Sequence, residues 1–196
     1  MLFISKKHTI FAEINYKFKN KTNMKKTAIV ITGIANSGKT STIKKVVEKV
    51  IEKIKKEKIE ANIQEIKDQI LSKEINIEDY TIPKSEKEDI SLIISINNNI
   101  RIGIESQGDT ICLFKKTLGI MKNNNCHIIL CAARIPAKGD TYHGIEKTLQ
   151  SYEIKPEEKE ELDKKNDIKQ SPEQETINKN SALYLYNKYF ESLLNK

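Results

Sequence analysis

The sequence contains one short motif whose residue types and spacing suit phosphate binding. Residues 33–40 read GIANSGKT, with glycine at 33 and 38, lysine at 39 and threonine at 40. Gly33 and Gly38 allow backbone conformations that a Cβ atom would penalise, so successive N–H groups can turn inward around an anion. Lys39 supplies a mobile cation for phosphate oxygens, and the Thr40 hydroxyl is suited to bind Mg²⁺.

The segments on either side of this motif are those that a phosphate-binding turn needs. Residues 28–31, AIVI, form an apolar run rich in β-branched residues, which predicts a buried strand before the turn. Residues 40–58 have an apolar stripe at helical spacing, formed by Ile43, Val46, Val47, Val50 and Ile54. Lys44 and the neighbouring lysines and glutamates are predicted to face water. The N-terminus of such a helix also favours an anion through its dipole.

In this motif the sequence resembles the P-loop NTPases, because it matches G-x-x-x-x-G-K-[ST] at every fixed position. The resemblance implies that the nucleotide is ATP or GTP and that Mg²⁺ accompanies it. It implies a catalytic role for Lys39 at the β- and γ-phosphates and a metal-binding role for Thr40. The residues expected to contact the nucleotide are Gly33, Ile34, Ala35, Asn36, Ser37, Gly38, Lys39, Thr40 and Ser41.

A second group of chemically capable residues follows a predicted β-hairpin. Residues 90–96 and 100–105 are apolar runs joined by three asparagines, and the second run leads into Glu105-Ser106-Gln107-Gly108-Asp109. A carboxylate at a strand end beside the phosphate-binding turn can bind Mg²⁺ or orient an attacking water. We therefore expect Glu105 to be catalytic and metal-binding, and we expect the Gly108 N–H to approach the γ-phosphate.

The same residues resemble the Glu-x-x-Gly motif of an NTPase subgroup that includes the urease nickel-insertion and cobalamin-associated metallochaperone GTPases. By position the resemblance carries over to Glu105, Gly108 and Asp109. The alternative is a charged strand end that leads into a turn and has no catalytic role.

The loop after a fourth apolar run, residues 127–132, has competing interpretations. Lys138-Gly139-Asp140 is similar to the end of the guanine-reading Asn-Lys-x-Asp motif, but Ala137 replaces the asparagine, which disfavours GTP. Alternatively Arg134 and Lys138 act at the phosphates, as lid arginines do in small-molecule kinases. A surface loop with two ordinary cations is the third interpretation. We retain Arg134 as a candidate catalytic residue.

Composition and charge limit the classes of partner. The 196 residues suit one domain with a sizeable core, and no apolar run approaches the ~20 residues of a membrane span. Residues 1–26 contain seven lysines and one glutamate and carry almost all of the formal net charge of +7. The rest of the chain is therefore nearly neutral, which argues against nucleic acid as a partner of the core domain. Three scattered cysteines without C-x-x-C spacing indicate a reducing, cytoplasmic compartment.

Three further segments carry weaker signals. Residues 1–23 are predicted to be a dispensable basic extension of a domain over 24–196. In residues 59–88, the spacing of Ile63, Ile66 and Ile70 indicates a short helix before a loop in which Thr81 is a candidate Mg²⁺ sensor. Residues 153–170, rich in Glu and Lys, are predicted to form a solvated helix or mobile linker. A final helix is expected to begin at Ser171-Pro172.

These patterns predict an α/β domain with the three-layer P-loop NTPase fold. We expect a mostly parallel sheet with one antiparallel hairpin strand at an edge. The expected function is Mg²⁺-dependent hydrolysis of a nucleoside triphosphate, ATP rather than GTP, coupled to a conformational switch or to an unidentified protein or small-molecule partner. The first alternative is a kinase that transfers the γ-phosphate to a nucleotide or small molecule. The second is a metallochaperone-type GTPase.

Overall fold

The described part of the chain combines strands and helices, with five consecutive strands between its first and second helices. The computed structural model describes residues 25–33, 37–85, 88–97, 99–108, 111–134, 141–158 and 172–195. Its strands are β1 (Thr27–Thr32), β2 (Ala61–Lys67), β3 (Ile70–Leu71), β4 (Ile75–Asn76), β5 (Ser91–Ile96), β6 (Ile100–Glu105), β7 (Ile128–Ala133) and β8 (Glu153–Glu158). Its helices are α2 (Lys39–Lys56), α3 (Ile111–Asn123), α4 (Thr141–Thr148), α5 (Pro172–Leu185), the π-helical η1 (Tyr186–Phe190) and α6 (Glu191–Leu194).

Within the described residues, eight strands form one sheet in the order β3-β2-β5-β6-β7-β1-β8, and β4 pairs with β2 beside this path. Strands β6, β7, β1 and β8 run parallel to one another. Strands β5, β2, β3 and β4 are joined by antiparallel pairing, and β5 pairs antiparallel with β6. The predicted α/β class is confirmed. The sheet is mixed, so our prediction of a mostly parallel sheet is wrong.

The error comes from residues 59–88, where we expected a short helix and a loop. Residues 61–67 instead form β2, which pairs with β5 and places the predicted 90–105 hairpin inside the sheet and not at its edge. Ile63 and Ile66 have helix-like spacing, but they are buried in apolar clusters on opposite faces of the sheet. Asp68 and Gln69 both have positive φ (49° and 65°), as in the tight turns that join antiparallel strands.

Residues 153–158 also differ from the prediction of a solvated helix or linker. They form β8, an edge strand that pairs in parallel with β1 from Thr27↔Glu153 to Thr32↔Glu158. An edge position tolerates this polar sequence, including Pro156, because one side of the strand needs no partner for its N–H groups. Residues 159–171 lie outside the described part of the chain.

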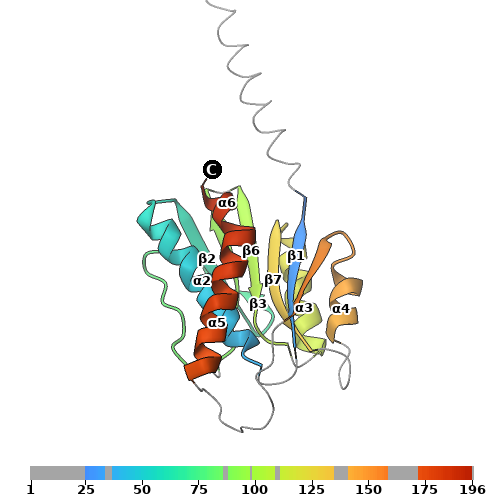
Figure 1. Cartoon of the computed structure of the whole chain (residues 1–196). Coiled ribbons are helices and arrows are strands. Elements are labelled where there is room, and N and C mark those ends of the chain that lie inside the picture. The colour runs from blue at the N-terminus through green and yellow to red at the C-terminus, as the bar shows by residue number, and fades with distance from the viewer. Residues whose placement is uncertain are drawn as a thin grey trace, which may run out of the picture.

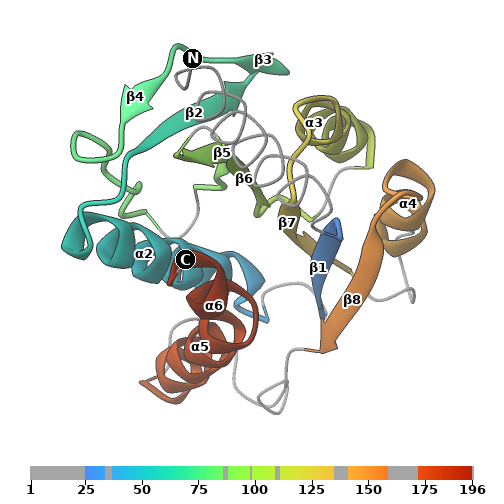
Figure 2. The same cartoon turned by 90° about the horizontal axis from the view of Figure 1, so that it is seen from above.

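Helices cover both faces of the sheet. α2, α5 and α6 lie on one face, and α3 and α4 lie on the other (Figure 1, Figure 2). On the first face, the predicted stripe of α2, including Ile43 and Val46, packs against β-strand residues and against Phe190 of η1. On the second, Phe114 of α3 and Ile145 of α4 pack against β1 and β7. The two cores hold β1 rigidly between them, and the turn that follows β1 starts from this fixed point.

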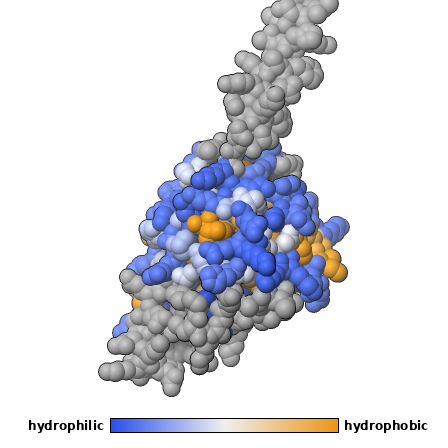
Figure 3. Space-filling view, turned by 90° about the vertical axis from the view of Figure 1, so that its right-hand side faces the viewer, coloured by the Kyte–Doolittle hydropathy of each residue, from blue (hydrophilic) through white to orange (hydrophobic). Residues whose placement is uncertain are grey.

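The surface is mostly polar. The face in Figure 3 is mainly hydrophilic, with small apolar patches. Among the described residues, the large apolar side chains that are exposed are Ile70, Leu183 and Tyr184. In the same part of the chain, no helix combines the length and apolar character needed to cross a membrane. Tyr184 is of further interest because it lines a cleft next to the site described below.

Candidate functional site

The side chain of Lys39 contacts both ends of the turn between β1 and α2. Gly38 precedes α2 and has a φ of 79°, a left-handed conformation that favours glycine. The Lys39 side chain is almost fully buried, and its Nζ donates hydrogen bonds to the Gly33 carbonyl oxygen at 3.0 Å and to Ser37 Oγ at 3.4 Å. The ammonium group therefore links Gly33 and Ser37, the described residues at the two ends of the turn. Residues 34–36, predicted to contact nucleotide, lie outside the described residues.

The residue after this lysine connects the turn to two other strands. Thr40 Oγ1 lies 3.1 Å from Asp89 Oδ1 and 3.3 Å from the carbonyl oxygen of Ser106. The Ser106 hydroxyl donates to the same Asp89 oxygen at 2.9 Å and accepts a hydrogen bond from the Ile90 N–H at 2.8 Å. Thr40, Asp89 and Ser106 thus form one polar cluster at the start of α2, the start of β5 and the end of β6. Ser41, also predicted to contact nucleotide, is half-buried in the first turn of α2.

A buried lysine of α2 holds the segment that leads to Asp89. Lys44 was predicted to face water, but it is 6% exposed. Its Nζ donates to the carbonyl oxygens of Pro83 at 3.3 Å and Ser85 at 2.6 Å. This correction has a physical reason, because the helix face that carries Lys44 is covered by the chain between β4 and β5. Thr81, the candidate Mg²⁺ sensor, is exposed in this segment.

Glu105 ends β6 as predicted, but β6 is not next to β1. β7 lies between them in the sheet, but the end of β6 still reaches the start of α2, because the Ser106 carbonyl oxygen lies 3.3 Å from Thr40 Oγ1. The Glu105 side chain is 1% exposed. Ser91 Oγ donates to its Oε2 at 2.5 Å, and the Gln107 N–H donates to its Oε1 at 2.8 Å. These contacts direct the carboxylate toward β5 and its own following turn.

Burial also changes the acidity of Glu105. Desolvation raises the pKa of this carboxyl to about 7, and the nearby negative charge of Asp89 acts in the same direction. Hydrogen bonds from Ser91, the Gln107 N–H and Thr117 lower the pKa but do not offset the burial. A carboxyl that exchanges its proton near neutral pH is suited to accept a proton from water.

Gly108 and Arg134 lie just beyond the carboxyl ends of the neighbouring parallel strands β6 and β7. Gly108 packs on β7, where an added Cβ atom would lie 3.3 Å from the Ala132 Cβ. Arg134 follows β7, and its N–H donates to Thr141 Oγ1 at 2.9 Å. Ala133 pairs with Thr32 in the parallel register, so Arg134 and Gly33 are the next residues on adjacent strands. Asp109, Lys138 and the rest of residues 135–140 lie outside the described residues.

The opposite side of the turn is contacted by α5. Gln174 Nε2 donates to the Ser37 carbonyl oxygen at 3.4 Å and to Asn178 Oδ1 at 3.1 Å. Asn178 is 4% exposed and also accepts a hydrogen bond from Thr42 Oγ1 at 3.4 Å. A Cβ atom on Gly38 would lie only 2.4 Å from Asn178 Oδ1. The absence of a side chain at 38 is therefore needed both for the turn's conformation and for the approach of α5.

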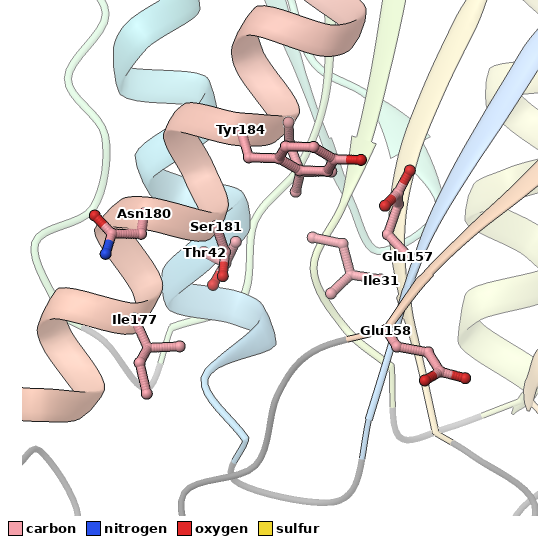
Figure 4. Close-up of a pocket in the computed structure, with 9 residues that line it drawn as sticks. Ile31, Thr42, Glu157, Glu158, Ile177, Asn180, Ser181 and Tyr184 are labelled. Carbon is pink, nitrogen blue, oxygen red and sulfur yellow. The ribbon is translucent and has the colours of Figure 1, made fainter.

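A cleft of about 300 Å³ lies on the far side of the Thr42–Asn178 contact. Thr42 of α2 and Ser181 of α5 both line it, and Figure 4 shows Tyr184 above them and the carboxylates of Glu157 and Glu158 on the strand side. Two carboxylates disfavour a phosphate group, so this cleft does not compete with the turn as an anion site. Glu157 is further occupied by Lys188 at 2.8 Å and by the Tyr189 hydroxyl.

The site contains oxygen atoms of the kind that Mg²⁺ prefers, namely a hydroxyl and carboxylates. Thr40 and Asp89 bring two of them together, whereas the Glu105 carboxylate accepts hydrogen bonds from Ser91 and the Gln107 N–H. Within the described residues, no three or more His, Cys, Asp or Glu side chains are grouped as a metal site. The fit is thus to an ion that a phosphate group helps to bind and not to an all-protein metal centre.

Sequence reasoning missed Asp89 and Asn178. A signal for Asp89 was present, because the predicted hairpin pairs residues 90 and 91 with the end of β6, which brings position 89 near Ser106. Asn178 had a weaker signal, its i, i+4 spacing from Gln174 on the final helix. Neither signal pointed to the turn itself, which lies far away in the sequence.

Comparison with known proteins adds no constraint to this picture. Neither a protein-family model, nor a curated protein, nor a solved structure matches the chain.

Proposed function

We propose that the protein binds a nucleoside triphosphate at the turn between β1 and α2 and hydrolyses it with Mg²⁺. This assigns it to the P-loop NTPases that its motif resembles, with ATP favoured over GTP. The observation that carries the proposal is the buried Lys39 ammonium, which lies across a turn that begins at Gly33 and ends at the left-handed Gly38. A lysine ammonium held between the two ends of a turn at a helix N-terminus is an arrangement that favours phosphate binding.

Each residue of the site has a role in this proposal. N–H groups of the turn and of the first residues of α2 bind phosphate oxygens, and Lys39 neutralises the charge that develops on the γ-phosphate. Thr40 supplies a hydroxyl oxygen for Mg²⁺. When bound, Mg²⁺ would neutralise negative charge on the phosphate groups. Glu105, whose pKa of about 7 comes from burial, is the residue suited to accept a proton from the attacking water.

Arg134 has a supporting role in the proposal. It follows β7, the strand that separates the turn from Glu105, and it comes directly after a residue paired with Thr32. A guanidinium at this edge is able to stabilise negative charge on a transferred phosphate. The same arrangement would serve a kinase, in which an acceptor hydroxyl takes the place of water, and this phosphotransferase is the alternative function.

The first experiment compares nucleotide binding by wild type, Lys39→Ala and Lys56→Ala. Both lysines belong to α2, but Lys56 is exposed at its far end and serves as the matched control. We expect Lys39→Ala to weaken ATP binding by about 30-fold or more, which corresponds to about 2 kcal/mol for a lost charge-assisted contact. Lys56→Ala is expected to bind as wild type does.

The second experiment separates hydrolysis from transfer. Phosphate release without any acceptor supports the hydrolase. ADP formation that requires an added nucleotide or small-molecule acceptor supports the kinase. Wild-type protein that binds neither ATP nor GTP, with or without Mg²⁺, would overturn the proposal. Equal affinity in wild type and Lys39→Ala would show that the motif match has no functional content.

A further inference from the structure

We infer that Asp89 is the carboxylate that binds the nucleotide-associated Mg²⁺ together with Thr40, in the place that the sequence motif assigns to Glu105. The inference rests on the proposed function, and it names the ion-binding residue of that same site. Three features of the structure support it: the spacing of the oxygen atoms, the exposure of the two carboxylates and the hydrogen bonds that orient Asp89.

The spacing of the oxygen atoms matches what a small divalent ion needs. Mg²⁺ binds six oxygens at about 2.1 Å, so two neighbouring ligands of an octahedron are about 3.0 Å apart. Thr40 Oγ1 and Asp89 Oδ1 are separated by 3.1 Å. The two atoms can therefore become adjacent ligands with little movement, and one carboxylate plus a hydroxyl leaves the remaining positions for phosphate oxygens and water.

The two acidic residues differ in access. Asp89 is exposed, so an ion carried by a nucleotide can reach it from solvent. Glu105 is 1% exposed, and its two oxygens accept hydrogen bonds from Ser91 and the Gln107 N–H. A hydrated ion such as Mg²⁺ gives up water reluctantly and is bound through accessible carboxylates. Access thus favours Asp89 over Glu105.

The orientation of Asp89 is set by Ser106 and by the anchored chain that precedes it. Ser106 donates to Asp89 Oδ1 at 2.9 Å while its own hydroxyl oxygen accepts from the Ile90 N–H, so the serine cannot turn away without losing both bonds. Lys44 anchors the preceding chain through the carbonyl oxygens of Pro83 and Ser85. An exposed carboxylate held at both ends of its segment is preorganised for an ion, which reduces the entropy lost on binding.

The test measures how much Mg²⁺ strengthens nucleotide binding, and it does not depend on turnover. ATP, and in parallel GTP, is titrated into the full chain in EDTA and again in excess Mg²⁺. The variants are Asp89→Asn, Glu105→Gln and the matched control Glu88→Gln, which removes an exposed charge at the neighbouring position. Binding of Mn²⁺ in the presence of ADP, followed by electron paramagnetic resonance, provides a second measurement on the same proteins.

We expect Asp89→Asn to keep the affinity measured in EDTA and to lose about tenfold or more of the gain that Mg²⁺ gives, with a matching loss of bound Mn²⁺. Glu88→Gln and Glu105→Gln are expected to keep most of that gain. If Asp89→Asn retains the full Mg²⁺ gain, the ion assignment is overturned while nucleotide binding stands. If wild type binds no nucleotide in any condition, the proposed function fails and the ion site fails with it.

Discussion

The turn between β1 and α2 is contacted from two sides whose chemistry differs. On the side of α5, the neutral amides of Gln174 and Asn178 contact Ser37 and Thr42, and Asn178 is almost fully buried. On the side of β5 and β6, the contacts come from charged Asp89 and from Ser106. Neutral amides can be buried at small cost when hydrogen-bonded, whereas a carboxylate that must bind an ion has to stay accessible.

The two sides make different contributions to the turn, one to its shape and the other to its charge. The α5 side sets the shape of the turn, and a salt bridge between Lys45 and Glu175 at 2.7 Å helps to hold α5 on α2. The side of β5 and β6 sets its electrostatics. Loss of shape should weaken nucleotide binding equally with and without Mg²⁺, whereas loss of charge should affect only the steps that involve the ion or the attacking water.

Gly38→Ala should disturb both the backbone conformation of the turn and its contact with α5, and we expect it to have the largest effect. The φ of 79° costs an alanine about 1–2 kcal/mol, and the new Cβ atom would lie 2.4 Å from Asn178 Oδ1. With the overpacking included, we expect a loss of about 4 kcal/mol of stability and the loss of measurable nucleotide binding. Thermal unfolding and ATP titration would measure both effects.

Gly119→Ala is the control for this variant. Gly119 lies in α3, and a Cβ atom there meets nothing within 4 Å. Helix propensity predicts a gain of up to about 1 kcal/mol. The double variant Gly38→Ala/Asn178→Ala separates the two effects, because removing the asparagine relieves the clash but not the backbone strain. Full stability in Gly38→Ala alone would mean that α5 does not approach the turn as described.

Glu105→Gln tests the raised pKa of this buried carboxyl through the pH dependence of the free energy of unfolding. In the folded protein this carboxyl keeps its proton up to about pH 7, whereas its ordinary pKa is 4.5. The folded state therefore binds more protons in this window, so the contribution of Glu105 to stability is full below pH 4.5 and is lost as pH rises through 7. Glutamine does not titrate, and we expect the variant to gain about 3 kcal/mol relative to wild type between these pH values.

The same variant should lose turnover by ~10²-fold while its nucleotide Kd stays similar, because a proton acceptor acts in the transition state. Glu74→Gln, an exposed carboxylate between β3 and β4, controls for the change of charge alone. Denaturant unfolding from pH 4.5 to 8 gives the first result and steady-state kinetics the second. A constant stability difference across this range, or wild-type turnover, would contradict the role of the buried carboxyl.

Asn178→Ala should weaken the contact between α5 and the start of α2 without adding backbone strain. The change removes an acceptor from Thr42 Oγ1 and Gln174 Nε2, which we expect to cost about 1–2 kcal/mol. ATP affinity should fall by the same factor in EDTA and in Mg²⁺, in contrast to Asp89→Asn. Asn180→Ala, an exposed residue on the same helix, is the control. An effect that appears only with Mg²⁺ would show that the two sides are not separate.

Deletion of residues 1–23 should have the smallest effect. Both sides of the turn are built from residues between Ser37 and Ser106 and from α5, and the first described strand begins at Thr27. We expect melting temperature and ATP affinity to stay within experimental error of the full chain, as measured by thermal unfolding and titration. A clear drop in either would refute the interpretation of this segment as a dispensable extension.

Local patterns in the sequence predicted the elements that carry the site. The apolar run over 28–31 and the helix predicted over 40–58 correspond to β1 and α2 within two residues at each end. The asparagines at 97–99 correctly marked the hairpin between β5 and β6. These predictions succeed because strand alternation, helical spacing and turn residues depend on the nearest few side chains.

β2 and β8 could not be predicted in this way. Residues 61–67 have isoleucines at helix-like spacing, and residues 153–158 have the composition of a solvated segment. Both become strands because a neighbouring strand offers hydrogen-bonding partners along their length, which overrides a weak local preference. The presence of that neighbour is decided by the whole sheet.

Short-range patterns were enough to predict that a glycine-rich turn with Lys39 and Thr40 follows a buried strand, and that Glu105 ends another. The groups that face this turn depend on how distant segments pack. The strand order places β7 between β1 and β6. Packing of distant segments buries Glu105 and brings Asp89 to Thr40, which is 49 positions away in the sequence. It also brings Asn178 to Thr42, which is 136 positions away. The physical reason is that backbone conformation follows from neighbours along the chain, whereas the exposure of a carboxylate and its partners follow from which distant segments pack beside it.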